Sequence, residues 1–254
     1  MTMETARGLA GLASSHEPLF VVVGVFDGIH LGHVYLLEHL VREAAARGAR
    51  ATVITFDHHP DEVLTGSAPP LLCDPAERVR RLAEAGVAAT VVVHFDMRLR
   101  ETTYEAFVDQ VAERAPIAGF LMTPDAAFGF QRAGTPEALA ELGRTRGFEV
   151  VVVPPFELDG RPVRSADVRA AIAEGDVETA ARLLGRPHAV VGDATPADGG
   201  TTVRFELPVA LPPDGEYATI VDGTERASRV EEGGVRVPGI ATFGKTRVEF
   251  RAAG

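Results

Sequence analysis

Two histidines three residues apart are the residues of this sequence whose types and spacing best suit catalysis. His30 and His33 belong to the stretch G-V-F-D-G-I-H-L-G-H at residues 24–33. A helix that begins near His30 would place both imidazoles on one face of its first turn, because residues three apart are neighbours there. The N–H groups of a first turn are unpaired, and the helix dipole favours anions. The pair therefore predicts a phosphate site with its own proton donors.

The same stretch suits a nucleotide better than a metal ion. Gly28 and Gly32 allow a ligand to approach the backbone, since neither has a side chain. A zinc-protease helix carries histidines at i and i+4 with an adjacent glutamate, and this spacing differs. We therefore expect no metal ligands among these residues.

A second candidate phosphate contact lies at residues 164–169, R-S-A-D-V-R. Ser165 can act as the N-cap of a helix, and Arg169 could bind a triphosphate through two parallel hydrogen bonds. Asp167 either stabilises the first turn of this helix or repels the anion that Arg169 holds. Taken alone, the stretch is better interpreted as a helix cap with an exposed arginine.

Short apolar runs alternate with helical patterns along the first 186 residues. The expected strands are 19–24, 51–56, 89–95, 118–122 and 149–153, and the expected helices are 30–47, 74–85, 104–114 and 136–146. This alternation predicts a parallel α/β sheet, Rossmann-like, with helices on both faces because crossovers are right-handed. Residues 1–16 are expected to be frayed or weakly helical.

The candidate stretches follow predicted strands. They lie in five loops, at residues 26–33, 57–60, 95–97, 123–130 and 154–169. Ligands of parallel sheets bind beyond the carboxyl ends of the strands, so the five loops predict one site.

The pattern changes after Gly185-Arg186-Pro187. Helices at 165–174 and 176–184 are followed by short strands at 203–207, 216–221, 235–237 and 246–250, which predict a small C-terminal β domain. Residues 239–246 fit the P-loop pattern in full, but a P-loop is followed by a helix and residues 247–250 alternate like a strand. We reject the P-loop interpretation.

Composition excludes several classes of partner. The 254 residues, 46% of them hydrophobic, are enough for packed domains, and the net charge of −11 argues against a nucleic-acid partner. Lys245 is the only lysine, which excludes a Schiff-base lysine from the first 186 residues. The single Cys73 suits a reducing cytoplasm. No apolar run reaches membrane-spanning length, so no membrane partner is expected. The oligomeric state stays open.

Residues 24–33 resemble the first signature of bacterial FAD synthetases, the adenylyltransferase half of bifunctional riboflavin kinase/FMN adenylyltransferases, in the HxGH nucleotidyltransferase superfamily. The resemblance runs weakly from about Phe20 to Arg186 and implies a nucleotidyltransferase domain at residues 1–186. It implies adenylyl transfer from ATP to FMN, which gives FAD and pyrophosphate, with Mg²⁺ neutralising the triphosphate.

The resemblance also implies roles for the site residues. His30 and His33 would stabilise charge on the α-phosphate and the leaving oxygen, while Ser165 and Arg169 would hold the other phosphates. These last two are all that survives of the family's Ser-Ser-Thr-x-x-Arg motif. The residues implied to bind the nucleotide are Gly24, Phe26, Asp27, Gly28, Gly32, Asp125, Phe128 and Gly129.

Two further segments resemble the family in part. Residues 55–60, T-F-D-H-H-P, are similar to the family's Thr-Phe-x-x-His-Pro, which implies that Phe56, His59 and Pro60 bind the flavin acceptor; His58 could equally be a solvated loop residue. Residues 187–254 resemble the start and end of a riboflavin kinase barrel and lack its Gly-x-Pro-Thr-x-Asn segment. We therefore expect a vestigial barrel without kinase activity.

Two alternatives stay open from the sequence. The first keeps the fold and the transfer but changes the acceptor or the nucleotide. The second is a catalytically weak nucleotide- or flavin-binding protein, and the altered phosphate motif and the vestigial tail are its basis.

Overall fold

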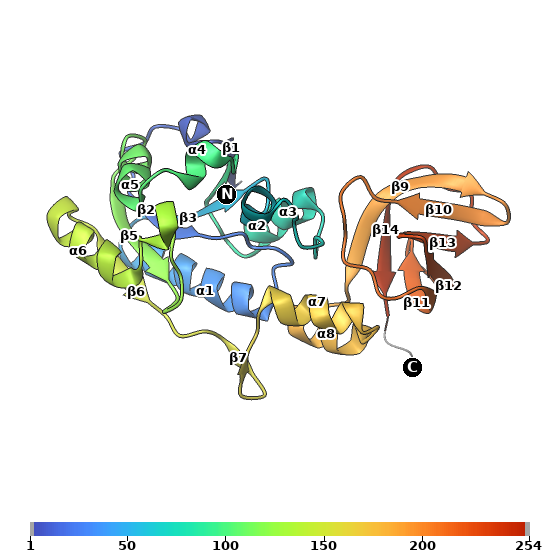
Figure 1. Cartoon of the computed structure of the whole chain (residues 1–254). Helices are drawn as coiled ribbons and strands as arrows, with labels where there is room; N and C mark the ends of the chain where they lie inside the picture. The colour runs from blue at the N-terminus through green and yellow to red at the C-terminus, as the bar shows by residue number, and fades with distance from the viewer. Residues whose placement is uncertain (1–2, 252–254) are drawn as a thin grey trace. The chain divides into compact units, whose positions relative to one another are not determined.

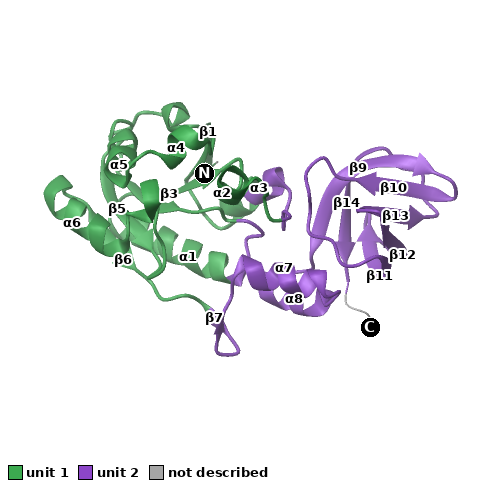
Figure 2. Ribbon diagram, viewed as in Figure 1, with its two compact units in different colours: residues 1–26, 32–69, 79–156 green, residues 27–31, 70–78, 157–254 purple. Residues whose placement is uncertain are grey.

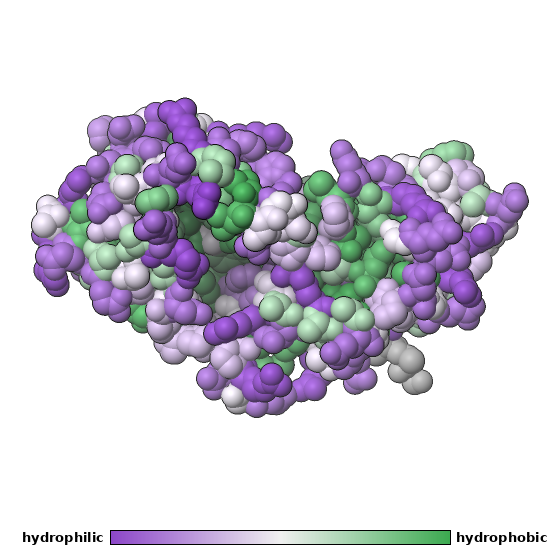
Figure 3. Space-filling model, viewed as in Figure 1, coloured by the Kyte–Doolittle hydropathy of each residue, from purple (hydrophilic) through white to green (hydrophobic). Residues whose placement is uncertain are grey.

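A computed structural model describes residues 3–251 of the chain, which form two compact units (Figure 2). The first unit holds the chain up to Phe26 together with Gly32–Pro69 and Val79–Phe156. The second holds Asp27–Leu31, Pro70–Arg78 and the chain from Glu157 onward. The domain boundary predicted at Arg186 differs from these bounds and stays a prediction. The face drawn in Figure 3 is mostly hydrophilic.

A parallel sheet of six strands forms the centre of the first unit, in the order β1-β4-β3-β2-β5-β6 (Figure 1). The strands are β1 Glu4–Arg7, β2 Leu19–Val23, β3 Arg50–Phe56, β4 Ala89–Val93, β5 Ile117–Met122 and β6 Glu149–Val152. The predicted parallel sheet is confirmed. The chain adds strands on one side of β2 and then on the other, so the gap between β2 and β5 is the switch point at which ligands bind in such sheets.

Helices connect these strands. They are α1 Leu31–Ala46, α2 Pro60–Thr65, α3 Pro75–Glu84, α4 Met97–Arg100, α5 Tyr104–Ala112 and α6 Pro136–Arg146, with 3₁₀ turns at Leu9–Gly11 and Phe130–Arg132. Right-handed crossovers in opposite directions put α1 on one face and α5 and α6 on the other. The core agrees, because Phe107 of α5 and Leu139 of α6 share one buried cluster with Val21 and Ile54. Thr103 and Thr135 cap α5 and α6 with their hydroxyl oxygens.

The prediction for the N-terminal residues was wrong where the structure describes them. Residues 4–7 form β1, which pairs in parallel with β4, and Gly8 N–H donates to the carbonyl of Val92 at 2.8 Å. Only Ala6 of the four strand residues is buried. So short and polar an edge strand has no hydrophobic pattern of its own, and its order depends on its neighbour. Residues 1–2 lie outside the described part of the chain.

The second unit contains two helices, a two-stranded hairpin and a closed antiparallel barrel. The elements are β7 Glu157–Leu158, β8 Arg161–Pro162, α7 Ser165–Ala173, α8 Val177–Leu184, β9 Ala189–Ala197, β10 Gly200–Arg204, β11 Gly215–Val221, β12 Thr224–Glu231, β13 Gly234–Pro238 and β14 Gly244–Phe250. The barrel order is β10-β13-β12-β11-β14-β9, which confirms the predicted β domain. Thr246 lies inside β14, so the rejection of a P-loop there is confirmed.

Three barrel strands were misjudged from the sequence. Strands β9 and β12 were not predicted, and β10 begins three residues before the predicted strand. In β10 and β12 the reason is that buried polar residues break the alternation that marks a strand. Ser228 of β12 is buried and lies 2.6 Å from the hydroxyl of Thr219, and the buried hydroxyl of Thr201 donates to the carbonyl of Ile240 at 2.8 Å.

Gly119 of β5 gives a test of packing in the first unit. A Cβ atom there would lie 2.6 Å from the Phe20 ring and 2.7 Å from the carbonyl oxygen of Glu149. We expect Gly119→Ala to lower the free energy of unfolding by about 1–3 kcal/mol, because neither neighbour can yield without moving the sheet. The control is Gly11→Ala, whose Cβ would meet Ala6 at an ordinary 3.7 Å. Urea unfolding of both variants checks this, and equal midpoints would contradict it.

Candidate functional site

A cavity of about 110 Å³ in the first unit opens where β2 and β5 end, at the predicted switch point. His33, Phe26, Gly24 and Phe128 line it, so the structure brings four predicted site residues together. The rings of Phe26 and His33 lie 5.0 Å apart. A Cβ on residue 24 would lie 3.0 Å from the Phe26 ring, which explains the glycine. Phe26 has a φ of 52°, a backbone conformation that residues other than glycine rarely adopt.

The two predicted histidines differ in their position relative to helix α1. Helix α1 begins at Leu31, so Gly32 and His33 lie in its first turn. His30 was predicted to lie in that turn and instead precedes the helix. The prediction failed because Ile29, with a φ of 41°, holds the chain in a turn just before it.

The loop after β5 forms the other wall of the cavity. Phe128 packs against Phe107 and Phe120, with ring centroids 5.3 Å and 5.9 Å away. Gly129 has a φ of 76°, and a Cβ there would lie 2.5 Å from the backbone nitrogen of Tyr104. This glycine is therefore needed for packing.

The remaining predicted residue of this loop, Asp125, has a local contact. Its carboxylate accepts a hydrogen bond from the hydroxyl of Thr123 at 2.8 Å, and the N–H of Ala126 donates to the carbonyl of Thr123. These contacts are those of a turn residue, and the contact of Asp125 with a nucleotide stays a prediction.

The residues predicted to bind the flavin follow β3. Phe56 is its last residue, and its ring meets that of Phe95 edge-on at 5.3 Å. His59 is the N-cap of α2, because its Nδ1 accepts the N–H of Asp61 at 3.2 Å, and Pro60 is the first residue of that helix. The structure thus gives each of these residues a local role, and their contact with an acceptor stays a prediction.

A buried carboxylate joins three segments of the second unit. The Asp27 side chain is 4% exposed, and its Oδ2 accepts a hydrogen bond from the guanidinium of Arg169 at 2.5 Å. Both oxygens of Asp27 lie 3.1 Å from the amide of Leu72. The hydroxyl of Ser165 donates to the Asp27 carbonyl at 3.2 Å. Three predicted site residues therefore meet in one hydrogen-bonded group.

The start of α7 differs from the prediction. Arg164 holds the N-cap position that was predicted for Ser165, and Ser165 is the first helical residue. The hydroxyl of Ser165 reaches Asp27 instead of the helix N–H groups. The Asp167 carboxylate accepts the N–H of Arg164 at 3.2 Å, so it stabilises the first turn of α7.

His30 also belongs to the second unit and is 4% exposed. Burial, together with the charges of Arg186 and Arg169, lowers the pKa of this imidazole to about 4. His30 is therefore neutral at pH 7. A neutral imidazole can donate one hydrogen bond but brings no positive charge.

Arg186 is a site residue that the sequence analysis missed. Its guanidinium donates to the carbonyls of Gly28 at 2.5 Å and Ile29 at 3.0 Å and so fixes the segment before α1. Gly28 has a φ of 81°, and a Cβ there would lie 2.9 Å from the Leu72 side chain. No local pattern marks Arg186, because its carbonyl partners are 157 and 158 residues away in the chain.

Several known proteins are similar to this chain. A model of the FAD synthetase family matches residues 12–167. A bifunctional riboflavin kinase/FMN adenylyltransferase of Pseudomonas fluorescens is 32% identical over 191 residues, which are 75% of this chain and 61% of that protein. The protein of the same name from Escherichia coli K12 is 31% identical over 246 residues, which are 95% of this chain and 78% of that protein.

A solved structure has the same fold. The crystal structure of a protein from Streptococcus pneumoniae, described as a macrolide-efflux protein, has a TM-score of 0.82 and 23% sequence identity. The match covers 98% of this chain and 89% of that one. Among residues 3–251, no helix is both long and apolar enough to span a membrane.

The Asp27 carboxylate gives a test of the second unit. We expect Asp27→Asn to lower the free energy of unfolding by about 3–5 kcal/mol, because it leaves the largely buried Arg169 without its counter-charge. The control is Asp159→Asn, which breaks the exposed pair of Asp159 with Arg182 and should cost no more than about 1 kcal/mol. Denaturant titrations measure both, and equal losses would contradict a special role for Asp27.

The buried histidines predict a pH dependence of stability. The pKa of His30 is about 4 in the folded chain and about 6.5 when unfolded, so its contribution is present above pH 6.5 and is lost as the pH falls toward 4. His188 has the same pKa of about 4, mainly because it is buried. Between pH 7 and pH 5 each should remove about 2 kcal/mol of stability.

The variant His30→Gln separates this effect from that of the carboxylates. Its stability should fall by about 2 kcal/mol less than that of the wild type over the same pH interval, since one titrating group is absent. Urea unfolding at both pH values gives the difference, and parallel pH profiles would refute it.

Proposed function

Because the chain belongs to the FAD synthetase family, we propose that it transfers the adenylyl group of ATP to FMN, which gives FAD and pyrophosphate. The observation that carries this proposal is the position of His33, at the switch point of the sheet and within the matched residues 12–167. The names of the two curated relatives support the same reaction. An enzyme with another acceptor has no observation in its favour.

The cavity of the first unit suits the base of the nucleotide. Its walls include the aromatic side chains of Phe26 and Phe128, together with Gly24. Aromatic rings stack favourably on one another. We assign adenine to this cavity, with the α-phosphate toward His33.

The reaction needs charge stabilisation more than covalent help. An oxygen of the FMN phosphate attacks the α-phosphorus of ATP, and the bond to the bridging oxygen of pyrophosphate breaks with its electron pair. His33 and His30 would donate hydrogen bonds to the oxygens on which charge develops. As His30 is neutral at pH 7, its contribution is that of a hydrogen-bond donor and not of a cation.

Arg169 can hold phosphate only with the donors that the protein leaves to it. A guanidinium has five N–H donors. The N–H of Nε donates to the carbonyl of Pro70, and one N–H of Nη2 donates to the carboxylate of Asp27. We assign the remaining donors to the β- and γ-phosphates. The hydroxyl of Ser165 would join them by turning its single O–H away from the carbonyl of Asp27.

Mg²⁺ would enter this reaction with the triphosphate and neutralise its charge. Mg²⁺ prefers oxygen ligands and keeps several waters. The carboxylate of Asp27 already accepts hydrogen bonds from Arg169 and Leu72. In the described part of the chain, the one cluster of three metal-binding side chains includes two imidazoles, which suits Mg²⁺ poorly. The phosphates themselves are therefore the ligands that we propose for Mg²⁺.

The other expectations remain predictions. They are small-molecule partners without nucleic acid, a cytoplasmic location and a barrel without riboflavin kinase activity. The alignment with the Escherichia coli relative covers 95% of this chain and 78% of that bifunctional protein.

The proposed role of His33 has a direct test. We expect His33→Ala to lower the rate of FAD formation from ATP and FMN by about 100-fold or more, because it removes a donor to developing charge. The rate is measured with purified protein, Mg²⁺ and chromatographic detection of FAD. The control is His39→Ala in the same helix, which does not line the cavity and should leave the rate unchanged. A folded His33→Ala protein with full activity would refute the assignment.

A further inference from the structure

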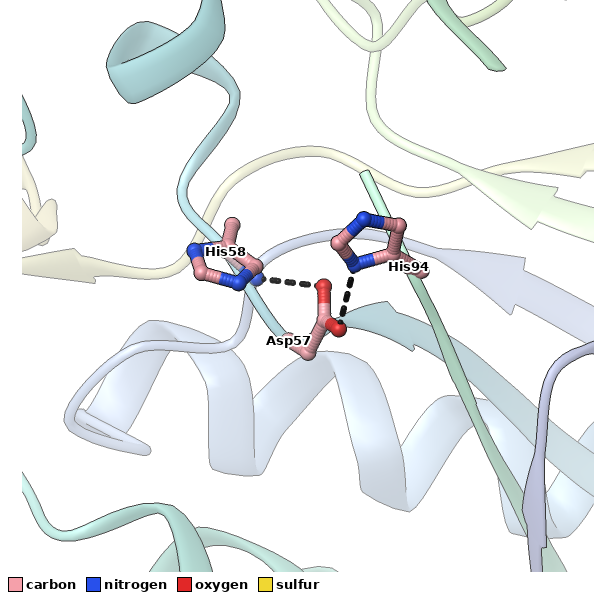
Figure 4. A group of neighbouring side chains, drawn as sticks. All are labelled: Asp57, His58 and His94. Atoms are coloured by element: carbon pink, nitrogen blue, oxygen red, sulfur yellow. Dashed lines mark hydrogen bonds and ion pairs between the residues drawn. The ribbon is translucent and has the colours of Figure 1, made fainter. Parts of the chain in front are cut away.

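Asp57, His58 and His94 place three metal-binding side chains together at the surface of the first unit (Figure 4). Each offers one ligand atom, and these atoms lie within 4.8 Å of one another. The cluster has a simple origin in the sheet. Asp57 directly follows β3 and His94 directly follows β4, and these parallel strands pair with Phe56 opposite Val93. Register therefore brings Asp57 and His94 side by side.

Backbone amides fix the carboxylate of this cluster. Its Oδ1 accepts the N–H of His58 at 2.7 Å and that of Phe95 at 3.1 Å. Its Oδ2 then faces His94, whose Nδ1 lies 2.8 Å away. Figure 4 shows both imidazole rings beside the carboxylate. The Asp57 oxygen is thus held in place before any ion binds.

A second carboxylate orients the other imidazole. The Nδ1 of His58 lies 3.0 Å from Oε2 of Glu62, which is one turn further along in α2. Histidines that bind metal ions usually donate their other ring N–H to a carboxylate in this manner, which fixes the ring and strengthens its remaining nitrogen as a ligand. The His58 and His94 rings meet edge-on, with centroids 5.4 Å apart.

We propose that Asp57, His58 and His94 bind a divalent transition-metal ion of the Zn²⁺ type. Two imidazole nitrogens with one carboxylate oxygen suit Zn²⁺, Co²⁺ and Ni²⁺, whereas Mg²⁺ and Ca²⁺ prefer oxygen alone. Three protein ligands leave a fourth position for water.

The geometry requires only small side-chain movements. In a tetrahedral site with bonds of about 2.0–2.2 Å, the ligand atoms lie roughly 3.4 Å apart. The ion would take the place of the proton shared by Nδ1 of His94 and Oδ2 of Asp57. The ligand atoms now lie within 4.8 Å of one another, and rotation of the exposed imidazoles can bring them to the separation that a tetrahedral site requires.

The cluster is distinct from the residues assigned to the nucleotide and the flavin. Asp57 and His58 occupy the two positions that the Thr-Phe-x-x-His-Pro pattern leaves open, and His94 belongs to a separate loop. The ion proposed here is therefore additional to the Mg²⁺ that accompanies ATP, and its binding can be measured without either substrate.

The test uses the full chain, freed of metal by a chelator. Zn²⁺ is titrated by calorimetry, and Co²⁺ is added while the visible absorption is recorded, because its d–d bands report the coordination geometry. We expect one ion per chain. His58→Ala and His94→Ala should each weaken binding by about 10-fold or more, because each removes a ligand. Loss of a residue that only hydrogen-bonds to a ligand already weakens metal binding by about 10-fold or more.

The control is His16→Ala, which removes an exposed histidine outside the cluster and should leave the affinity unchanged. Circular dichroism establishes that each variant is folded. Absence of binding to the wild type would overturn the proposal. So would binding that persists at full strength in either His58→Ala or His94→Ala, because the site would then lie elsewhere or use fewer ligands.

Discussion

One buried carboxylate joins the segments of the second unit that lie outside the barrel. Asp27 receives hydrogen bonds from the amide of Leu72 and from the guanidinium of Arg169, so it joins three segments that are far apart in the sequence. Two charges removed from water are stable only when their geometry satisfies both partners. Arg186 completes this arrangement by holding the carbonyls of Gly28 and Ile29. The position of His30 follows from these contacts.

The same ion pair links structure to the proposed chemistry. Arg169 is the residue of this unit that we propose to bind the triphosphate. Part of its guanidinium is already paired with the carboxylate of Asp27. A phosphate that contacts Arg169 shares the guanidinium with a carboxylate of like charge, which limits how tightly it can be held. The helix that carries Arg169 adds a further anion in Asp167, although that side chain is engaged by the N–H of Arg164.

The sequence was sufficient for the elements whose hydrophobic pattern is strong. The inner strands of the sheet and the helices beside them are where the periodicity places them, because their apolar faces are buried. Strands β1 and β12 were not predicted, because polar residues occupy their faces and each forms a strand only by pairing with neighbouring strands. Strand-end loops could be predicted as the location of the site, since that rule depends only on topology.

Side-chain roles within the site were harder to predict. A Phe-Asp-Gly sequence is the same whether its carboxylate faces a ligand or the amide of Leu72, 45 residues away. His58 could not be told apart from a solvated loop residue, because His94 approaches it only through the register of β3 and β4. Long-range pairing decides both cases, and a single sequence does not reveal it.

The interleaving of the two units in the chain has a consequence for biosynthesis. The chain passes between them after Phe26, Leu31, Pro69, Arg78 and Phe156, so no continuous segment encodes either unit. A ribosome adds about 5–20 residues per second. Arg169 follows Asp27 by 142 residues and therefore emerges roughly 7–30 s after it. During that interval the nascent chain lacks Arg169, which pairs with Asp27 in the folded protein. The histidine-bearing segment can therefore reach its final position only late in translation.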